Sequence, residues 1–167
     1  VALTLHVLDQ LAASGYPLEF WWDRSLTRPP SAACSVLDKI QACGAVQKTQ
    51  SGSDLGARMF HTLQAGLQWA DKVLIVGSDC PTVDAACLTK AARALDNGDV
   101  VIGPSDDGGY VLLGASRVEE GMLEGVDWGT SRRLQELGLT HTLLAPGWDV
   151  DDITDWQRFV EGRQLLA

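Results

Sequence analysis

Residues 73–82 of this chain read VLIVGSDCPT, and this stretch decides the fold class. Four consecutive apolar residues, Val73–Val76, predict a β-strand that is covered on both faces, as in the sheets of α/β proteins. Gly77 ends the run, and Asp79 follows at the expected carboxyl end of the strand, where open α/β sheets bind their ligands. Asp79 is therefore a candidate site residue. With Thr82 available to cap the next helix, capping is an equally simple role for Asp79.

Strand-like apolar runs alternate with helical periodicity along the rest of the chain, without an internal repeat or a low-complexity linker. This alternation predicts one α/β domain over residues 1–167 with a mostly parallel sheet. Strands are expected at residues 18–22, 45–48, 72–76, 99–103, 110–114 and 142–144. Helices are expected at residues 1–12, 33–40, 55–67, 88–95, 130–137 and 156–160.

Acidic residues dominate the charge, with 22 Asp and Glu against 13 Lys and Arg and a net charge of −9. No Lys/Arg cluster offers a phosphate-binding face, which argues against nucleic acid and anionic membranes as partners. An acidic substrate would need a cation as mediator. No apolar run approaches the ~20 residues that span a bilayer, and the first residues lack the basic region of a signal peptide, so we expect a cytoplasmic protein.

The next expected strand ends in GPSDDGGY, residues 103–110. Two adjacent carboxylates, Asp106 and Asp107, lie between a Gly-Pro and a Gly-Gly pair, and glycine occurs where the backbone takes a positive φ or lets a ligand approach. The same residues also suit a solvated turn between two strands. The apolar run that follows at once favours a binding loop over a simple linker.

A third acidic stretch, DVDDITDW, lies where the last strand leads into the last helix. Asp149 and Asp151 alternate, so an extended chain points both side chains the same way, a suitable spacing for two ligands of one cation. Alternatively, Asp152 or Thr154 caps the helix and the remaining acids are solvated.

The common position of the three acidic stretches favours one shared site over three separate turns or caps. All of them fall at expected strand ends: Asp79, the pair Asp106 and Asp107, and the pair Asp149 and Asp151. Carboxylates from separate strands suit a hard cation, and Mg²⁺ or Mn²⁺ held by carboxylates and phosphate oxygens is usual for phosphorylated substrates. We therefore expect such an ion as cofactor.

Two further loops are candidate binding loops. QSGSDLGARM places Asp54 between glycines and Arg58 in the first turn of a helix, where backbone N–H groups and a guanidinium can hold an anion; an N-capped helix after a flexible loop is equally consistent. VDWGTS places Trp128 before a capping Thr130, and the indole could stack on a base or sugar or close the core.

Cysteine chemistry and the common nucleotide motifs have little support. Cys80 near a helix start could be a thiolate, but no histidine is identified as its base. The four cysteines lack CxxC spacing and are expected to be reduced and mostly buried. The chain has no GxSxG, GxxxxGK[ST] or GxGxxG motif.

In this order and spacing, VGSDCP, GPSDDGGYVLLG, WGTS and DVDDITDW resemble the bacterial glycosyltransferase-A-like (GT-A-like) family of nucleotide-diphospho-sugar transferases, which includes arsenosugar biosynthesis glycosyltransferases. GSDLGARM resembles the GDLGxRM loop of that family, and the resemblance covers about residues 52–155. It implies a GT-A-like three-layer α/β sandwich related to the sugar-nucleotide and molybdenum-cofactor nucleotidyltransferases.

The resemblance also implies roles for individual residues. Asp79 would meet the metal and the donor diphosphate, and Asp151, with Asp149 beside it, would supply a second carboxylate. The DGGY motif of the family lines the sugar or acceptor side, and it stands here at Asp107, Gly108, Gly109 and Tyr110. Asp107 is a candidate base if the reaction inverts the anomeric centre.

We therefore expect metal-dependent transfer of a glycosyl group from a nucleoside-diphosphate sugar to a small acceptor. Alternatives are nucleotidyl transfer to a phosphorylated small molecule and a degenerate binding domain without activity. A haloacid-dehalogenase-like phosphatase is set aside, because the nucleophilic aspartate of such enzymes follows the first strand, whereas Asp79 lies in the middle of this chain. The chain opens on a helix at Val1, so we expect the first strand and the nucleotide-gripping loop of the family to be missing upstream, and the exposed first helix could support a homodimer.

Overall fold

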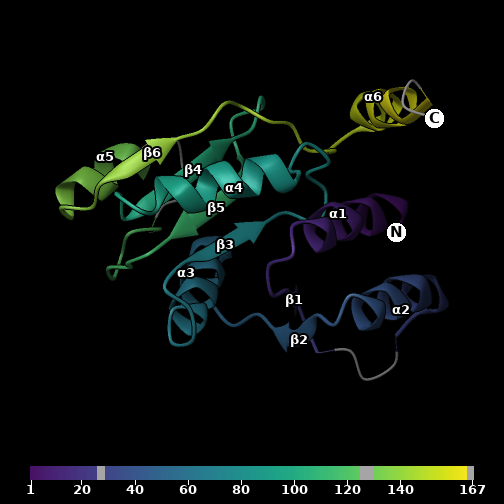
Figure 1. Cartoon of the computed structure of the whole chain (residues 1–167), viewed down its shortest axis with the longest axis horizontal. Coiled ribbons are helices and arrows are strands. Elements are labelled where there is room, and N and C mark those ends of the chain that lie inside the picture. Colours follow the sequence, from purple (N-terminus) through teal and green to yellow (C-terminus); the bar gives the residue numbers. More distant parts are fainter. Residues whose placement is uncertain (26–28, 125–129, 165–167) are drawn as a thin grey trace.

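The computed structural model describes residues 1–25, 29–124 and 130–164 (Figure 1). The predicted order of helices and strands is confirmed, with a 3₁₀ turn before the second helix. The helices are α1 (Ala2–Ala13), η1 (Ser31–Ala33), α2 (Cys34–Ala42), α3 (Leu55–Gly66), α4 (Ala85–Ala94), α5 (Thr130–Glu136) and α6 (Ile153–Gln164). The strands are β1 (Glu19–Trp22), β2 (Val46–Thr49), β3 (Val73–Val76), β4 (Val100–Pro104), β5 (Tyr110–Ala115) and β6 (His141–Leu143).

The strands form two sheets, a parallel β1–β2 pair and a four-stranded sheet in the order β3-β5-β4-β6. Strands β3, β4 and β6 run in one direction and β5 runs against them, because β5 pairs antiparallel with both β3 and β4 while β4 pairs parallel with β6. The α/β fold is therefore as predicted. The larger sheet is mixed because β5 lies between β3 and β4 and runs opposite to both.

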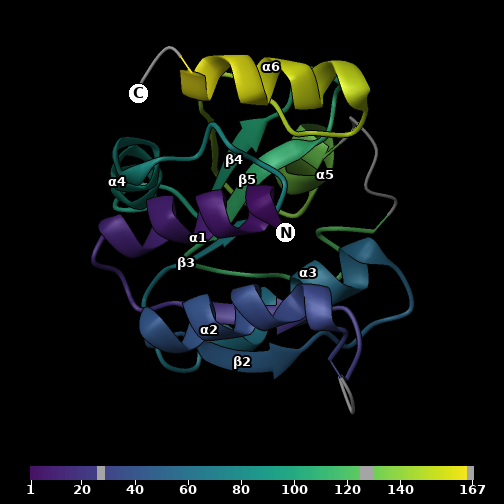
Figure 2. The ribbon, with the colours of Figure 1, turned by 90° about the vertical axis from the view of Figure 1, so that its right-hand side faces the viewer.

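Helices cover both faces of this sheet, and Figure 2 shows α4 and α5 on opposite sides of β4 and β5. One core cluster joins Leu63 of α3 and Leu134 of α5 to one face of β4 and β5, and the other joins α4 to the opposite face. Strand β3 contributes alternate side chains to both clusters, so the covering of both faces that its apolar run predicted is confirmed. A third cluster packs Leu8 of α1 against Val36 and Ile40 of α2.

Two details of the sequence interpretation are corrected. Thr82 does not cap α4; Asp84 does, and its carboxylate accepts the Cys87 N–H at 2.7 Å. The thiols are not mostly buried, because Cys80 is the one buried cysteine of four free ones.

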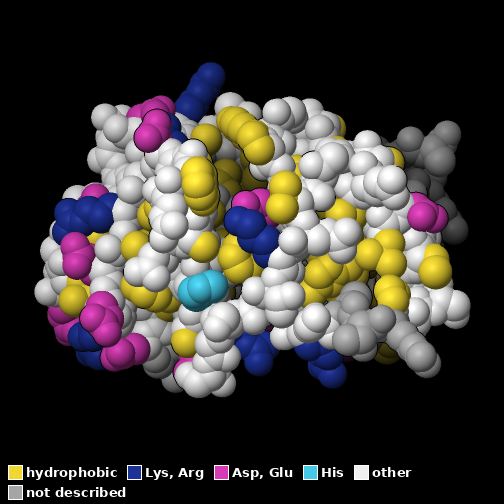
Figure 3. Space-filling model, turned by 90° about the horizontal axis from the view of Figure 1, so that it is seen from below, with side chains coloured by type: hydrophobic (Ala, Val, Ile, Leu, Met, Phe, Trp, Pro, Cys, Tyr) yellow, Lys and Arg dark blue, Asp and Glu magenta, His cyan; other side chains and the backbone are white. Residues whose placement is uncertain are grey.

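Within the described residues, no helix combines the length and the apolar character that a membrane crossing requires. On the face seen in Figure 3, Lys and Arg side chains stand in small separate groups, most of them beside Asp or Glu. This face therefore lacks the continuous basic area that nucleic-acid-binding proteins present.

Candidate functional site

Three carboxylates converge where β4 ends and where the chain enters α6. Asp107, Asp149 and Asp151 each place an oxygen within 4.8 Å of the others, with Asp149 half-buried and the other two exposed. Oxygen ligands of Ca²⁺ and Mg²⁺ lie about 2.0–2.6 Å from the ion, so three oxygens at this spacing can reach a common cation. We refer to these three residues as the carboxylate triad.

The turn between β4 and β5 fixes Asp107. The Gly109 N–H donates to its carboxylate at 2.8 Å, and the Ser105 N–H donates to the Gly109 carbonyl at 2.9 Å. Gly108 adopts φ 106°, a conformation that glycine tolerates best. The Gly109 amide lowers the pKa of Asp107, which favours the ionised form that a cation needs and makes this group a weaker base.

Hydrogen bonds divide the carboxylates of DVDDITDW between two tasks. Asp152 accepts the N–H groups of Thr154 at 2.7 Å and Asp155 at 3.0 Å, so it caps α6, as the alternative interpretation of this stretch proposed. Asp155 accepts the N–H groups of Asp151 and Asp152, both at 3.3 Å. Asp149 and Asp151 are the two whose carboxylates join the triad.

The segment that carries Asp149 and Asp151 is tied to the β3 end by Thr82. The Thr82 hydroxyl donates to the Trp148 carbonyl at 3.3 Å and accepts the Trp148 N–H at 3.2 Å. The Val150 N–H donates to the Asp79 carbonyl at 3.1 Å. Residues far apart in the sequence therefore form one rim of the sheet.

Electrostatic repulsion marks the triad as a strongly negative site. The pKa of Asp151 is raised, first by the charge of Asp149, then by desolvation and by the charges of Asp107 and Asp79. Arg158 lies close by, but its guanidinium stacks 4.2 Å from the Trp148 ring and pairs with Asp106 at 3.5 Å. We call this arrangement of Arg158 between Trp148 and Asp106 the arginine clamp, and Asp106 belongs to it and not to the triad. A cation bound by the triad would relieve the repulsion among its carboxylates.

Asp79 lies beside the triad and acts on Asp151 electrostatically, but it is not one of the three converging residues. Its carboxylate lies over Gly77, where a Cβ atom would approach Asp79 Oδ1 and Cys80 Sγ to 2.6 Å, so the glycine makes room for both side chains. Burial, and then the charge of Asp79, raises the pKa of Cys80 far above its usual range, which argues against a reactive thiolate.

The remaining predicted site residues have mixed placements. Asp54 caps α3 through the Ala57 N–H at 2.9 Å, and this bond lowers its pKa; the Arg58 Nε donates to the Gly52 carbonyl at 3.4 Å. Tyr110 opens β5 and packs half-buried against the core. Thr130 begins α5, and Trp128 lies outside the described residues.

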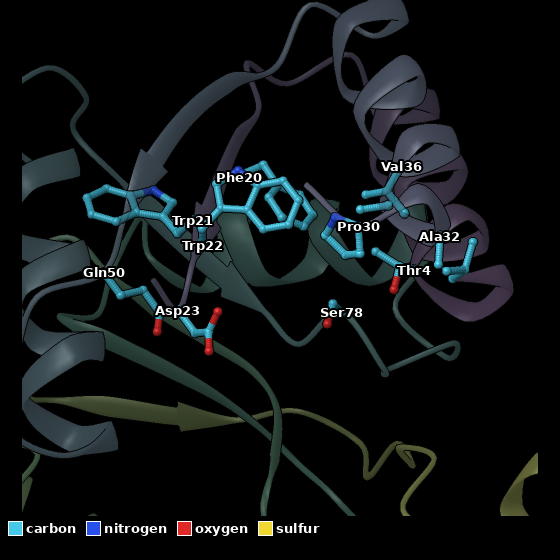
Figure 4. Close-up of a pocket in the computed structure, with 12 residues that line it drawn as sticks. Thr4, Phe20, Trp21, Trp22, Asp23, Pro30, Ala32, Val36, Gln50 and Ser78 are labelled. Carbon is cyan, nitrogen blue, oxygen red and sulfur yellow. The ribbon is translucent and has the colours of Figure 1, made fainter. Parts of the chain in front are cut away.

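A pocket of about 460 Å³ beside Asp79 was not predicted. Figure 4 shows the aromatic side chains of β1 in it, with Asp23 and Gln50 toward one end, Thr4, Ala32 and Val36 at the other, and Ser78 between. The triad is not in its lining, but Ser78 directly precedes Asp79, whose charge acts on Asp151 of the triad. The signal in the sequence was the pair Trp21 and Trp22 followed by Asp23 at a strand end, which is equally typical of a core strand.

Comparisons with known proteins concern the family and the fold of the chain. A family profile described as "Uncharacterized protein conserved in bacteria (DUF2064)" matches residues 9–130. A search of curated proteins gives no match. A crystal structure from Desulfovibrio desulfuricans G20, provisionally named a nucleotide-diphospho-sugar transferase, is 26% identical with a TM-score of 0.70; the alignment covers 90% of this chain and 69% of that chain.

Two more distant structures share the fold. The 2-C-methyl-D-erythritol 4-phosphate cytidylyltransferase from Thermus thermophilus has a TM-score of 0.57 at 13% identity, covering 90% of this chain and 84% of that one. A CMP:2-keto-3-deoxy-manno-octonic acid synthetase complexed with CTP has a TM-score of 0.60 at 11% identity, covering 99% and 88%. The fold is thus the one found in nucleotide-diphospho-sugar transferases and cytidylyltransferases.

Proposed function

Because this chain belongs to the bacterial DUF2064 family and has a nucleotide-diphospho-sugar transferase fold, we propose that it transfers a glycosyl group from a nucleoside-diphosphate sugar to a small acceptor with the help of Mg²⁺ or Mn²⁺. The observation that carries this proposal is the convergence of Asp107, Asp149 and Asp151 at the strand ends. A net-negative protein needs a cation to hold a diphosphate against these carboxylates.

The pocket and the triad divide the donor between them. The side chains of Phe20, Trp21 and Trp22 offer apolar and aromatic surface for the nucleoside, and Asp23 and Gln50 offer polar groups to its base or ribose. Asp79 follows pocket residue Ser78 in the chain and its charge acts on Asp151, so its carboxylate would meet both the cation and the diphosphate.

In the reaction, the bond between the anomeric carbon and the diphosphate oxygen breaks, a bond from that carbon to an acceptor hydroxyl oxygen forms, and the hydroxyl proton passes to solvent. Asp149, Asp151 and Asp107 would hold the cation, which when bound offsets the charge on the departing nucleoside diphosphate. The turn of Gly108 and Gly109 and the start of β5 at Tyr110 lie beside Asp107 and suit the sugar or acceptor.

The experiment is a thermal-shift panel of UDP-, GDP-, dTDP- and CDP-sugars and nucleoside triphosphates, with and without Mn²⁺. A ligand at a hundred times its Kd adds about 2.7 kcal/mol, which for a domain of this size means several degrees. Asp79→Asn and Asp151→Asn should abolish the Mn²⁺-dependent shift and the turnover. Asp152→Asn is the matched control, because it removes one charge from the same stretch while Asn still caps α6. A donor shift that persists unchanged in Asp151→Asn would contradict the proposal.

Nucleotidyl transfer is the second candidate, supported by the fold shared with a cytidylyltransferase that is named for a phosphorylated substrate. The released product separates the two reactions, because glycosyl transfer releases a nucleoside diphosphate and nucleotidyl transfer releases pyrophosphate. An absence of binding across the whole panel would instead support a domain without activity.

A further inference from the structure

Ser105 is a buried polar residue at the junction of the two acidic loops. It is 6% exposed and directly follows β4. Its backbone is held on two sides: it exchanges hydrogen bonds with the Gly108 and Gly109 turn at 3.1 and 2.9 Å, and it forms a parallel bridge with Gly147. The position of its side chain is therefore fixed by the backbone of both loops.

Ser105 connects both loops, through its hydroxyl on one side and its backbone on the other. The hydroxyl donates to Asp149 Oδ1 at 2.5 Å. The backbone N–H donates to the carbonyl of Gly109, whose own N–H holds the Asp107 carboxylate at 2.8 Å. One buried residue thus links two members of the triad that lie 42 residues apart in the sequence.

A neutral donor suits this position for a physical reason. The three carboxylates repel one another, and Asp149 contributes most to the raised pKa of Asp151, so some contact must hold them together. A Lys or Arg here would neutralise the site and compete with a cation. A serine hydroxyl satisfies one oxygen of Asp149 and leaves the negative charge of the site in place.

We infer that Ser105 is a positioning residue that holds Asp149 and Asp107 in the arrangement that binds the divalent cation. This inference rests on the proposed function, because it presupposes that the triad binds the ion. A hydrogen-bond partner behind a metal ligand typically accounts for a 10–100-fold difference in metal affinity.

The test is a titration of the whole chain with Mn²⁺ in the absence of nucleotide. The electron paramagnetic resonance signal of the free ion measures how much Mn²⁺ is bound. Ser105→Ala should bind Mn²⁺ about 10–100-fold more weakly than the unaltered protein, and Ser105→Thr, which keeps the hydroxyl, should recover most of the affinity. The matched control is Ser116→Ala, which removes a hydroxyl at the far end of β5 that donates to the Gly98 carbonyl at 3.0 Å. It should leave the Mn²⁺ affinity unchanged.

The outcomes separate this inference from the proposed function. If the unaltered protein binds Mn²⁺ and Asp151→Asn does not, the triad is the site; equal affinity of Ser105→Ala and the unaltered protein then overturns the role of Ser105 alone. If the unaltered protein binds no Mn²⁺ without nucleotide, this inference fails, whereas the proposed function is decided by the thermal-shift panel with donor and Mn²⁺ together. Equal weakening by Ser105→Ala, Ser105→Thr and Ser116→Ala, in step with lost thermal stability, would show that Ser105 serves the fold and not the ion.

Discussion

At the rim of the sheet, the nearest hydrogen-bond donor decides the task of each carboxylate. Asp152 accepts hydrogen bonds from two helix N–H groups and caps α6, whereas Asp106 forms an ion pair with Arg158. Asp149 and Asp151 join Asp107 in the triad. The acid-rich stretches and the alternation of Asp149 with Asp151 were visible in the sequence. The division was not, because each partner comes from the other stretch: Arg158 near DVDDITDW pairs with Asp106, and Ser105 next to Asp106 binds Asp149.

The electrostatic surroundings of Asp151 lead to a prediction about the stability of the folded protein. Its raised pKa means that the folded protein disfavours its charge, so the repulsion acts at pH values above that pKa and disappears as the pH falls through it. Asp151→Asn should therefore leave the metal-free protein at pH 7 as stable as the unaltered protein or slightly more stable. Urea unfolding with a chelator present measures this, and a clear loss of stability would show that Asp151 supports the fold.

The same shift gives the pH dependence of ion binding. A proton and a cation compete for Asp151, so the Mn²⁺ affinity should fall as the pH drops through the raised pKa of this group. Mn²⁺ titrations at pH 7 and at successively lower pH values follow the effect. An affinity that stays constant down to pH 4 would exclude Asp151 as a ligand.

Between elements, Asp99 ties the start of β4 to the start of β6. Its carboxylate accepts the Thr140 N–H and the Thr140 hydroxyl, both at 2.8 Å, and its own N–H donates to the Thr140 hydroxyl at 3.0 Å. The periodicity of the sequence predicted both strands at nearly their observed bounds. It could not predict this pair, nor that Thr82 would bind Trp148 while Asp84 caps α4, because each partner choice depends on tertiary contacts.

We therefore expect the contact between Asp99 and Thr140 to make an acid-sensitive contribution to the free energy of unfolding. The Thr140 N–H, and then the Thr140 hydroxyl, lower its pKa, so the stabilisation is complete above the unfolded value of about 3.9 and is lost as the pH falls through the lowered pKa. Asp99→Asn should cost about 1–2 kcal/mol at pH 7 and much less near pH 2. Urea unfolding at both pH values measures the difference, and a cost that does not change with pH would contradict the charge-assisted contact.

Over the whole molecule, the sequence predicted the α/β class, the order of elements and the two-sided covering of β3, because apolar periodicity reports which faces are buried. It did not predict that β1 and β2 form a sheet of their own or that β5 lies between β3 and β4, because strand pairing depends on which edges meet in three dimensions. The homodimer that the exposed first helix suggested stays a prediction.

Hydrogen exchange can test the state of those edges. Among the described strands, β3 pairs only with β5, whereas β4 pairs on both sides and is almost fully buried. Alternate amides of an edge strand point away from its partner, so about half of the β3 amides should exchange rapidly while those of β4 stay protected. Uniform protection of β3 would instead mean that another strand or a second copy of the chain covers its open edge. Light scattering then separates these cases, because a second copy doubles the mass and a strand within the same polypeptide leaves the protein monomeric.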